Sequence, residues 1–134
     1  MQTSRLTLSP LRQLGATLAV LALFLSPLRA TDPGLSIAIK CSPATVILDA
    51  IRSGDCLTVH ADIKFRDVDT TLPVTLNGLE AYATFADNRG DLVAKFTMTD
   101  LAGLLAPPTT TLTLVGSTKG GVTFTGTDSV RVKR

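Results

Sequence analysis

Side chains that commonly build binding and catalytic sites are scarce in this chain. Its 134 residues include no tryptophan, one tyrosine, one histidine and two cysteines, and aromatic residues make up 4% of the sequence. A zinc site needs several ligands that are mostly His or Cys, and a platform on which bases or sugars stack needs aromatic rings. The composition therefore argues against a zinc site and against an aromatic surface for carbohydrate.

Acid–base catalysis also has few candidate residues. A hydrolytic triad would have to combine His60 with a serine such as Ser53 or Ser129, and the sequence has no Gly-x-Ser-x-Gly motif for a nucleophilic serine. Glu80 is the only glutamate, so a carboxylate pair for glycoside hydrolysis has little support. We expect no catalytic residues, no cofactor and no enzymatic activity, with a small secreted hydrolase as the less favoured alternative.

The first thirty residues have the order of a secretory signal. Arg5 and Arg12 precede an uncharged apolar run over residues 14–25, which Ser26-Pro27 interrupts just before Leu28-Arg29-Ala30. A positive start, a short apolar core and a small residue at the cleavage position define such signals. The apolar run is shorter than the about 20 residues that a membrane-spanning helix needs. We expect residues 1–30 to be a signal peptide, with an uncleaved N-terminal anchor as the alternative.

The charge balance changes once these residues are set aside. Three of the 13 basic residues and none of the 11 acidic residues lie in positions 1–30, so residues 31–134 carry ten basic and eleven acidic groups. A nucleic-acid-binding domain needs a concentrated basic surface, and this near-neutral segment shows none. Its length suits one domain with its own core. We expect a secreted or periplasmic domain that binds no nucleic acid and has no membrane span after cleavage.

Cys41 and Cys56 are the only cysteines. In an oxidising compartment such a pair is more often a disulfide than a metal or redox site, and the spacing is not Cys-x-x-Cys. A bridge closing a loop of about 15 residues would stabilise the fold by roughly 3 kcal/mol. Cys56 is out of phase with the apolar positions Leu57 and Val59. The prediction is a Cys41–Cys56 disulfide near strand ends, with two free thiols as the alternative.

Apolar and polar residues alternate in short runs along residues 31–134. From Leu57 to Phe65 every second residue is apolar and the residues between them are polar, the pattern of a half-buried strand. Similar runs occupy residues 36–41, 45–48, 74–76, 79–85, 91–97, 111–115 and 122–132. The runs predict an all-β fold, an immunoglobulin-like antiparallel β-sandwich of about seven to eight strands.

Turn residues separate these runs. Asn77-Gly78 predicts a type I′ hairpin because both residues tolerate positive φ. The segments Asp87-Asn88-Arg89-Gly90 and Lys119-Gly120-Gly121 predict two longer hairpin loops. One short helix is predicted after residue 98, with Thr99 as N-cap and Pro107-Pro108 as its end. We expect this helix to cross between two sheets.

Three segments together resemble immunoglobulin-like β-sandwich modules of exported bacterial and archaeal proteins. They are residues 74–78 (VTLNG), 87–96 (DNRGDLVAKF) and 112–132, and the closing pattern Phe124-x-Gly126-x-Asp128-x-Val130-Arg131-Val132 is the most specific part. The resemblance covers nearly all of residues 37–132. It implies an accessory module to which no single activity is attached.

The resemblance also makes the loop at residues 87–91 a calcium candidate. In fuller members this loop is rich in aspartate, and the present chain keeps Asp87, Asn88, Gly90 and Asp91 in a shorter version. Calcium takes about six to eight oxygen ligands, which three side chains do not supply. A turn in which Asp and Asn bond to their own backbone is therefore favoured. Arg89-Gly90-Asp91 also spells a cell-adhesion tripeptide, for which a chance match is the favoured explanation.

Asp128 shares the phase of the apolar residues Phe124, Val130 and Val132. An acid at the edge of a core needs hydrogen-bond partners, so we expect it to hold a neighbouring loop. The sequence as a whole indicates an exported, non-catalytic module with a structural or binding role. Its expected partners are other exported or cell-surface proteins, reached through a sheet face or an exposed edge strand. A calcium-stabilised adhesion module is the alternative.

Overall fold

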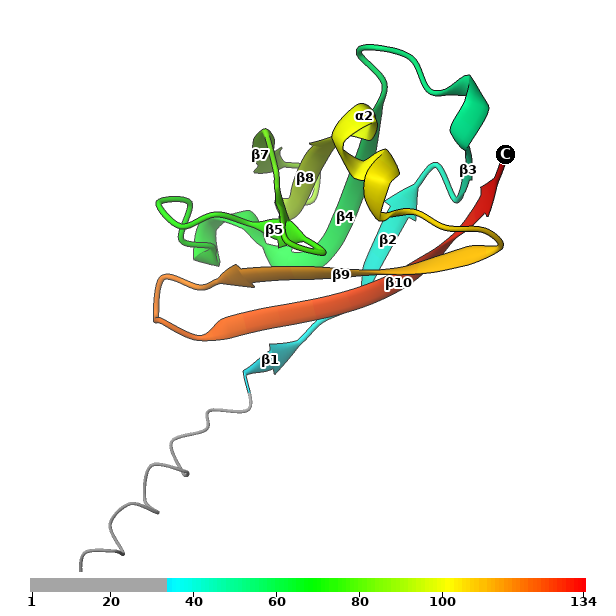
Figure 1. Cartoon of the computed structure of the whole chain (residues 1–134). Helices are drawn as coiled ribbons and strands as arrows, with labels where there is room; N and C mark the ends of the chain where they lie inside the picture. Colours follow the sequence, from blue (N-terminus) through cyan, green and yellow to red (C-terminus); the bar gives the residue numbers. More distant parts are fainter. Residues whose placement is uncertain (1–33) are drawn as a thin grey trace, which may run out of the picture. The chain divides into compact units, whose positions relative to one another are not determined.

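The computed structural model describes residues 34–134, which form two stacked β-sheets (Figure 1). Sheet A contains β1 (Leu35–Ser36), β3 (Thr45–Ile47), β5 (Thr75–Leu76), β6 (Leu79–Glu80), β9 (Thr109–Ser117) and β10 (Thr123–Lys133). Sheet B contains β2 (Ile39–Ser42), β4 (Cys56–Lys64), β7 (Ala83–Ala86) and β8 (Asp91–Thr97). The predicted signal peptide, residues 1–30, lies outside the described residues.

The order of the strands matches that of an immunoglobulin domain. Sheet A runs β1-β10-β9-β5-β6, with β3 also pairing with β10, and sheet B runs β2-β4-β8-β7. Immunoglobulin constant domains place strands A, B, E and D in one sheet and C, F and G in the other. Here β2, β4, β8 and β7 correspond to strands A, B, E and D. Strands β5, β9 and β10 correspond to C, F and G. The predicted all-β, immunoglobulin-like antiparallel sandwich is confirmed, with β1 and β3 as parallel additions to β10.

Ten strands form where eight runs are predicted, because two of the runs change sheet. The predicted strand over residues 79–85 divides into β6 in sheet A and β7 in sheet B. The N–H of Ala81 bonds to the carbonyl of Val74, whereas the next N–H, that of Tyr82, bonds to the carbonyl of Lys95, each at 2.9 Å. The predicted strand over residues 36–41 divides in the same way into β1 and β2. The alternation of apolar and polar residues indicates which side chains are buried, but it does not indicate which strand lies next to a given strand. The sequence therefore does not reveal where a run passes from one sheet to the other.

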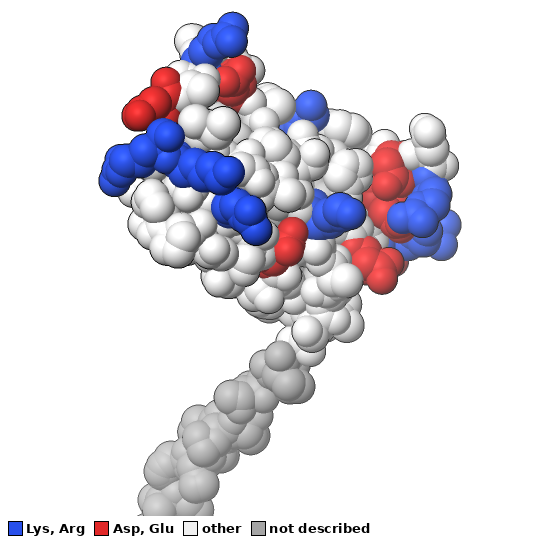
Figure 2. Space-filling view, turned by 90° about the vertical axis from the view of Figure 1, so that its right-hand side faces the viewer, with Lys and Arg blue, Asp and Glu red and all other residues white. Residues whose placement is uncertain are grey.

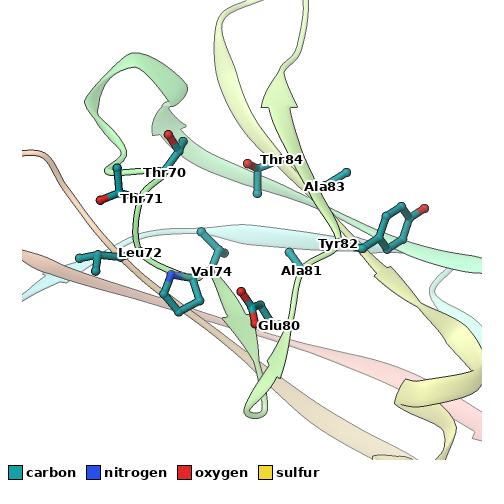
Figure 3. A pocket seen from close by; sticks show the side chains of 10 residues that line it. Thr70, Thr71, Leu72, Val74, Glu80, Ala81, Tyr82, Ala83 and Thr84 are labelled. Carbon is teal, nitrogen blue, oxygen red and sulfur yellow. The ribbon is translucent and has the colours of Figure 1, made fainter.

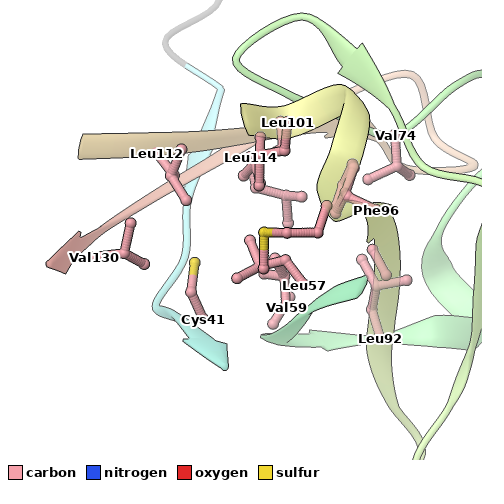
Figure 4. Close-up of a cluster of buried hydrophobic side chains, with 14 of the residues drawn as sticks. Cys41, Leu57, Val59, Val74, Leu92, Phe96, Leu101, Leu112, Leu114 and Val130 are labelled. Atoms are coloured by element: carbon pink, nitrogen blue, oxygen red, sulfur yellow. The ribbon is translucent and has the colours of Figure 1, made fainter. Parts of the chain in front are cut away.

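The core lies between the sheets and is filled from both of them (Figure 4). The alternation predicted for β4 is observed, since Leu57, Val59, Ala61 and Ile63 are buried while the residues between them are exposed or half-buried. Burial of a large apolar side chain contributes roughly 1.5–3 kcal/mol. The largest side chains that are fully buried are Phe96, Phe124, Leu57, Leu76, Leu92, Leu101, Leu112 and Leu114.

Two glycines allow close packing along the long strands β9 and β10. The ring of Phe124 lies over Gly116, its partner across the sheet, at the place where a Cβ would otherwise be. Gly126 faces the chain between β1 and β2, and a Cβ there would lie 2.6 Å from Ile39 Cγ2 and 2.8 Å from the carbonyl oxygen of Ile37. The glycine in the closing sequence pattern is therefore required for the first strands to pack on the last one.

Asp128 adds a hydrogen bond to the packing of the first strands on β10. One of its carboxylate oxygens, Oδ2, accepts the backbone N–H of Cys41 at 2.9 Å, and the other accepts its neighbour Ser129 N–H at 2.9 Å. Cys41 lies in β2 of sheet B, whereas Asp128 lies in β10 of sheet A. The side chain therefore joins the two sheets at one side of the sandwich. Its expected structural role is consistent with these contacts.

The predicted Asn77-Gly78 turn is observed, with φ of 48° at Asn77 and 87° at Gly78. The Asn77 side chain also bonds to β9, accepting the Thr113 N–H at 2.8 Å and donating to the Thr111 carbonyl at 3.2 Å. This hairpin is thus fixed to the centre of sheet A. The two longer hairpin loops, between β7 and β8 and between β9 and β10, are also as predicted.

The short helix forms, but its start differs from the prediction. Helix α2 spans Met98–Leu101, its N-cap is Thr97 without a side-chain hydrogen bond, and Thr99 lies inside the helix. The N–H of Met98 bonds instead to the carbonyl of Asp55 at 2.9 Å. Thr99 as N-cap is therefore wrong, because a contact with the segment before β4 sets the first turn.

Short 3-10 turns complete the fold, namely η2 (Leu48–Ala50), η3 (Phe65–Asp67) and η4 (Ala102–Leu104), which continues α2. The tighter winding of η4 leaves Leu104 43% exposed, although Leu101 and Leu105 are buried. Within residues 34–134, no helix has both the length and the apolar character required to cross a bilayer.

Candidate functional site

The structure brings His60, Asp87 and Asp91 together in a groove on the outer face of sheet B. The groove has a volume of about 370 Å³ and lies between β2, β4 and the turn that joins β7 to β8. His60 on β4 and Lys40 on β2 are paired across the sheet, and both side chains are exposed. Because further acidic and basic side chains complete the lining, the groove carries both signs of charge.

Asp87 organises the turn from β7 to β8 with its own side chain. Its Oδ1 accepts the N–H of Arg89 at 2.8 Å and that of Asp91 at 3.0 Å. These two hydrogen bonds, the one from Asp91 first, hold the pKa of the Asp87 carboxyl below its usual range. The turn in which Asp bonds to its own backbone, which the sequence favours, is therefore observed.

The other calcium candidates, Asp91 and Asn88, differ in exposure. Asn88 is exposed, whereas Asp91 is 7% exposed and its carboxylate is engaged by two cations, Lys64 Nζ at 3.0 Å and Arg89 Nη2 at 3.4 Å. A calcium ion at this turn would have to replace those contacts and the backbone bonds of Asp87. Among residues 34–134, no group of three or more His, Cys, Asp or Glu side chains is placed to hold a metal ion. The same ion pairs engage both charges of the Arg89-Gly90-Asp91 tripeptide.

The structure does not bring His60 together with either serine of the hydrolytic triad that the sequence offers. His60 points outward from sheet B, whereas Ser129 points outward from sheet A on the opposite side of the sandwich, where its hydroxyl lies 3.4 Å from that of Thr111. Ser53 is exposed in the loop before β4. The strand phases thus separate the histidine from Ser129 by the full thickness of the core.

The predicted Cys41–Cys56 disulfide is wrong for this fold, since both cysteines are free thiols. Cys41 lies opposite Val59 in the neighbouring strand, three residues along β4 from Cys56, which is about 10 Å of extended chain. Cys41 faces the core at 2% exposure, whereas Cys56 precedes the buried Leu57 and faces outward. Two cysteines so far apart and on opposite faces cannot be bridged.

The two thiols have different surroundings. Burial, with the charge and the hydrogen bond of Asp128 adding to it, raises the pKa of Cys41 to about 12. Cys56 Sγ lies 4.0 Å from Lys95 Nζ. A hydrogen bond to the Cys56 sulfur raises the pKa of Tyr82. Cys56 is therefore the cysteine within reach of reagents, and Cys41 is part of the core.

One edge of sheet B, formed by β2, is capped at Cys41. The N–H groups along a strand point alternately to its two sides, and in β2 the N–H of Cys41 points away from β4. Asp128 of sheet A accepts this N–H. The edge strand β2 is thereby capped by an acidic side chain, a common protection against unwanted strand pairing.

The opposite edge of sheet B, formed by β7, is open. The N–H of Asp87 donates a hydrogen bond to the carbonyl of Asp91 at 2.9 Å, toward β8. Backbone N–H groups along a strand point alternately to its two sides. The N–H of Phe85 therefore also points toward β8, and the N–H groups of Thr84 and Ala86 point away from β8. Among the described residues, none outside the ladders of the sheet accepts a hydrogen bond from these two groups. We call the outward N–H and carbonyl groups of Thr84 and Ala86 the β7 edge.

A hollow of about 210 Å³ lies directly beside this edge (Figure 3). In Figure 3, Thr70, Thr71 and Leu72 stand on one side of it and Thr84 on the other. It forms where the chain leaves sheet A after β6 and enters sheet B. We call it the β7 hollow; its other lining residues are Pro73, Val74, Glu80, Ala81, Tyr82 and Ala83.

Large apolar side chains are exposed around the β7 edge. Tyr82 is 58% exposed, Leu72 47% and Phe85 42%. Phe85 pairs with Val93, which also pairs with His60 and is buried on the outer face of sheet B. Phe85 and Val93 therefore lie next to each other on the outer face of sheet B. Sequence patterns give little sign that Phe85 is exposed, since it lies at one more apolar position of a predicted strand.

On the face shown in Figure 2, several basic side chains adjoin one another on the left, and acidic and basic side chains lie side by side on the right. Comparison of the chain with protein-family models, with curated proteins and with solved structures found no match.

Proposed function

We propose that the chain is an exported, non-catalytic module that binds another exported or cell-surface protein through the β7 edge. The observation that carries this proposal is the difference between the two edges of sheet B. Asp128 caps Cys41 on one edge, whereas Thr84 and Ala86 present free backbone groups on the other. An open edge pairs readily with an added strand, which gains main-chain hydrogen bonds along its length.

The surroundings of the edge support binding of a protein chain. The exposed side chains beside it include Tyr82 and Phe85, and Tyr and Phe are enriched at protein interfaces. The β7 hollow offers room for a side chain of the added strand. Export is supported by the signal-like order of residues 1–30 and by the resemblance to immunoglobulin-like modules of exported proteins.

The proposal is tested by selecting peptides from a displayed library of random ten-residue sequences. Thr84→Pro removes the outward N–H without affecting the ladder to β8, because the neighbouring residues make the ladder bonds. The matched control Thr84→Ala removes the side chain and keeps the N–H. We expect selected peptides to bind the wild type and Thr84→Ala and to lose binding to Thr84→Pro, with the three melting temperatures showing that each variant is folded. Equal binding to all three overturns the proposal.

A further inference from the structure

We infer that the β7 edge selects an extended segment in which a basic residue, Lys or Arg, lies between two apolar residues. The inference rests on the proposed function and adds the side-chain chemistry of the partner. It follows from the phase of β7 and from the charge of the β7 hollow.

The phase of β7 sets where the side chains of an added strand point. Phe85 faces outward, since it pairs with Val93 on the outer face of sheet B, and Thr84 therefore faces the hollow that it lines. Residues that lie opposite one another in neighbouring strands point to the same face. The partner residue opposite Thr84 consequently directs its side chain into the β7 hollow. The residues before and after it lie on the outer face, beside Ala83 and Phe85.

The charge of the hollow selects the side chain that enters it. Glu80 is the one charged residue in its lining, and within residues 34–134 no cation lies within ion-pair distance of it. Figure 3 shows Glu80 beside Val74 and Ala81. Asp69 lies next to this lining, where its carboxylate accepts the N–H of Thr71 at 3.0 Å and is also near the charge of Lys119. That hydrogen bonding to Thr71 keeps the pKa of Asp69 low.

A basic side chain satisfies both features of the hollow. Its aliphatic stem can lie along Val74 and Ala81 while its charged end reaches the carboxylate of Glu80. An acidic side chain in the same place would be repelled by the carboxylate of Glu80. The apolar residues on either side of it would cover Phe85, which is 42% exposed. The preferred partner is thus an extended segment with the order apolar, basic, apolar.

The test uses two fluorescein-labelled peptides, Thr-Val-Lys-Val-Thr and Thr-Val-Glu-Val-Thr, and the whole exported chain, with fluorescence anisotropy as the readout. We expect the wild type to bind the Lys peptide at least about fivefold more tightly than the Glu peptide. Glu80→Lys should reverse this preference, whereas Asp62→Lys, which changes the net charge equally on an exposed position of β4, should retain it.

The outcomes separate this inference from the proposed function. If Thr84→Pro abolishes binding but Glu80→Lys leaves the preference unchanged, the edge binds strands and the selection of a basic residue is overturned. If Thr84→Pro has no effect, or if neither peptide binds the wild type saturably, both are overturned. Reversal of the preference in Glu80→Lys together with loss of binding in Thr84→Pro supports both.

Discussion

The carboxylate of Asp128 in sheet A accepts the backbone N–H of Cys41 in sheet B at 2.9 Å. This single contact joins the last strand to the first strand of the opposite sheet and caps one edge of sheet B. The acid is half-buried between the sheets. Its loss would leave an N–H group without a partner at the margin of the core.

We expect Asp128→Ala to lower the free energy of unfolding by about 1–3 kcal/mol, the cost of a polar group left unsatisfied near the core. Asp128→Asn should lose less, because an amide oxygen still accepts the Cys41 N–H. Urea denaturation measures both changes. Asp62→Ala, an exposed aspartate on the outer face of β4, serves as the control and should change stability by less than about 0.5 kcal/mol. A loss in Asp128→Ala no larger than in this control would contradict the role given to Asp128.

Gly126 should not tolerate a side chain. A Cβ at this position would meet Ile39 Cγ2 at 2.6 Å and the carbonyl oxygen of Ile37 at 2.8 Å, so Gly126→Ala forces the first strands away from β10. The expected loss is about 1–3 kcal/mol of unfolding free energy. Gly120→Ala, where the nearest atom would be 3.8 Å away, is the matched control. If thermal denaturation shows equal stability for the two variants, the packing described at β10 is incorrect.

The two cysteines should react differently. With iodoacetamide, the native chain should gain one adduct, at Cys56, and the unfolded chain should gain two, because Cys41 is 2% exposed and its pKa is raised to about 12. Mass spectrometry of proteolytic fragments assigns the labelled residue. Absence of any adduct in denaturant without a reductant would show that the disulfide exists and that the free thiols do not.

The turn at Asp87 should contribute to sensitivity to acid. Its carboxyl has a pKa lowered from the ordinary 3.8 in the folded chain, so its contribution to stability is present above that value and is lost as the pH falls through the lower folded pKa. Asp87→Asn keeps an acceptor oxygen but cannot titrate. We expect the melting temperature of the wild type to fall more steeply below about pH 4 than that of the variant. Parallel pH profiles of the two proteins would refute a titrating role for Asp87.

Local patterns predicted much of the fold. The alternation around Leu57 and the turn at Asn77 depend on neighbours in sequence, and both are observed. The same alternation placed Cys56 out of phase with the apolar positions of its strand, which argued against the disulfide. The disulfide was predicted nevertheless, because the sequence contains a single pair of cysteines. The N-cap at Thr99 failed because the helix begins at a contact with Asp55, which sequence patterns do not report.

The candidate site was less accessible to prediction. His60, Asp87 and Asp91 could be named from the sequence, but their meeting in one groove depends on how β2, β4 and β8 pair. An exposed edge strand was expected, but its place at β7 could not be predicted, because the alternation over residues 79–85 predicts one strand. Only the change of sheet between Ala81 and Tyr82 creates both the edge and the hollow beside Glu80.

An open β7 edge can be distinguished from a closed one by amide hydrogen exchange, measured by NMR residue by residue on the chain. We expect the Cys41 amide, which is bonded to Asp128, to exchange slowly, and the Thr84 amide to exchange at the rate of an exposed loop. Addition of a selected peptide should then slow exchange at Thr84 and Ala86. Slow exchange at Thr84 in the free chain, equal to that of Cys41, would show that the β7 edge is closed and would contradict the binding of a strand there.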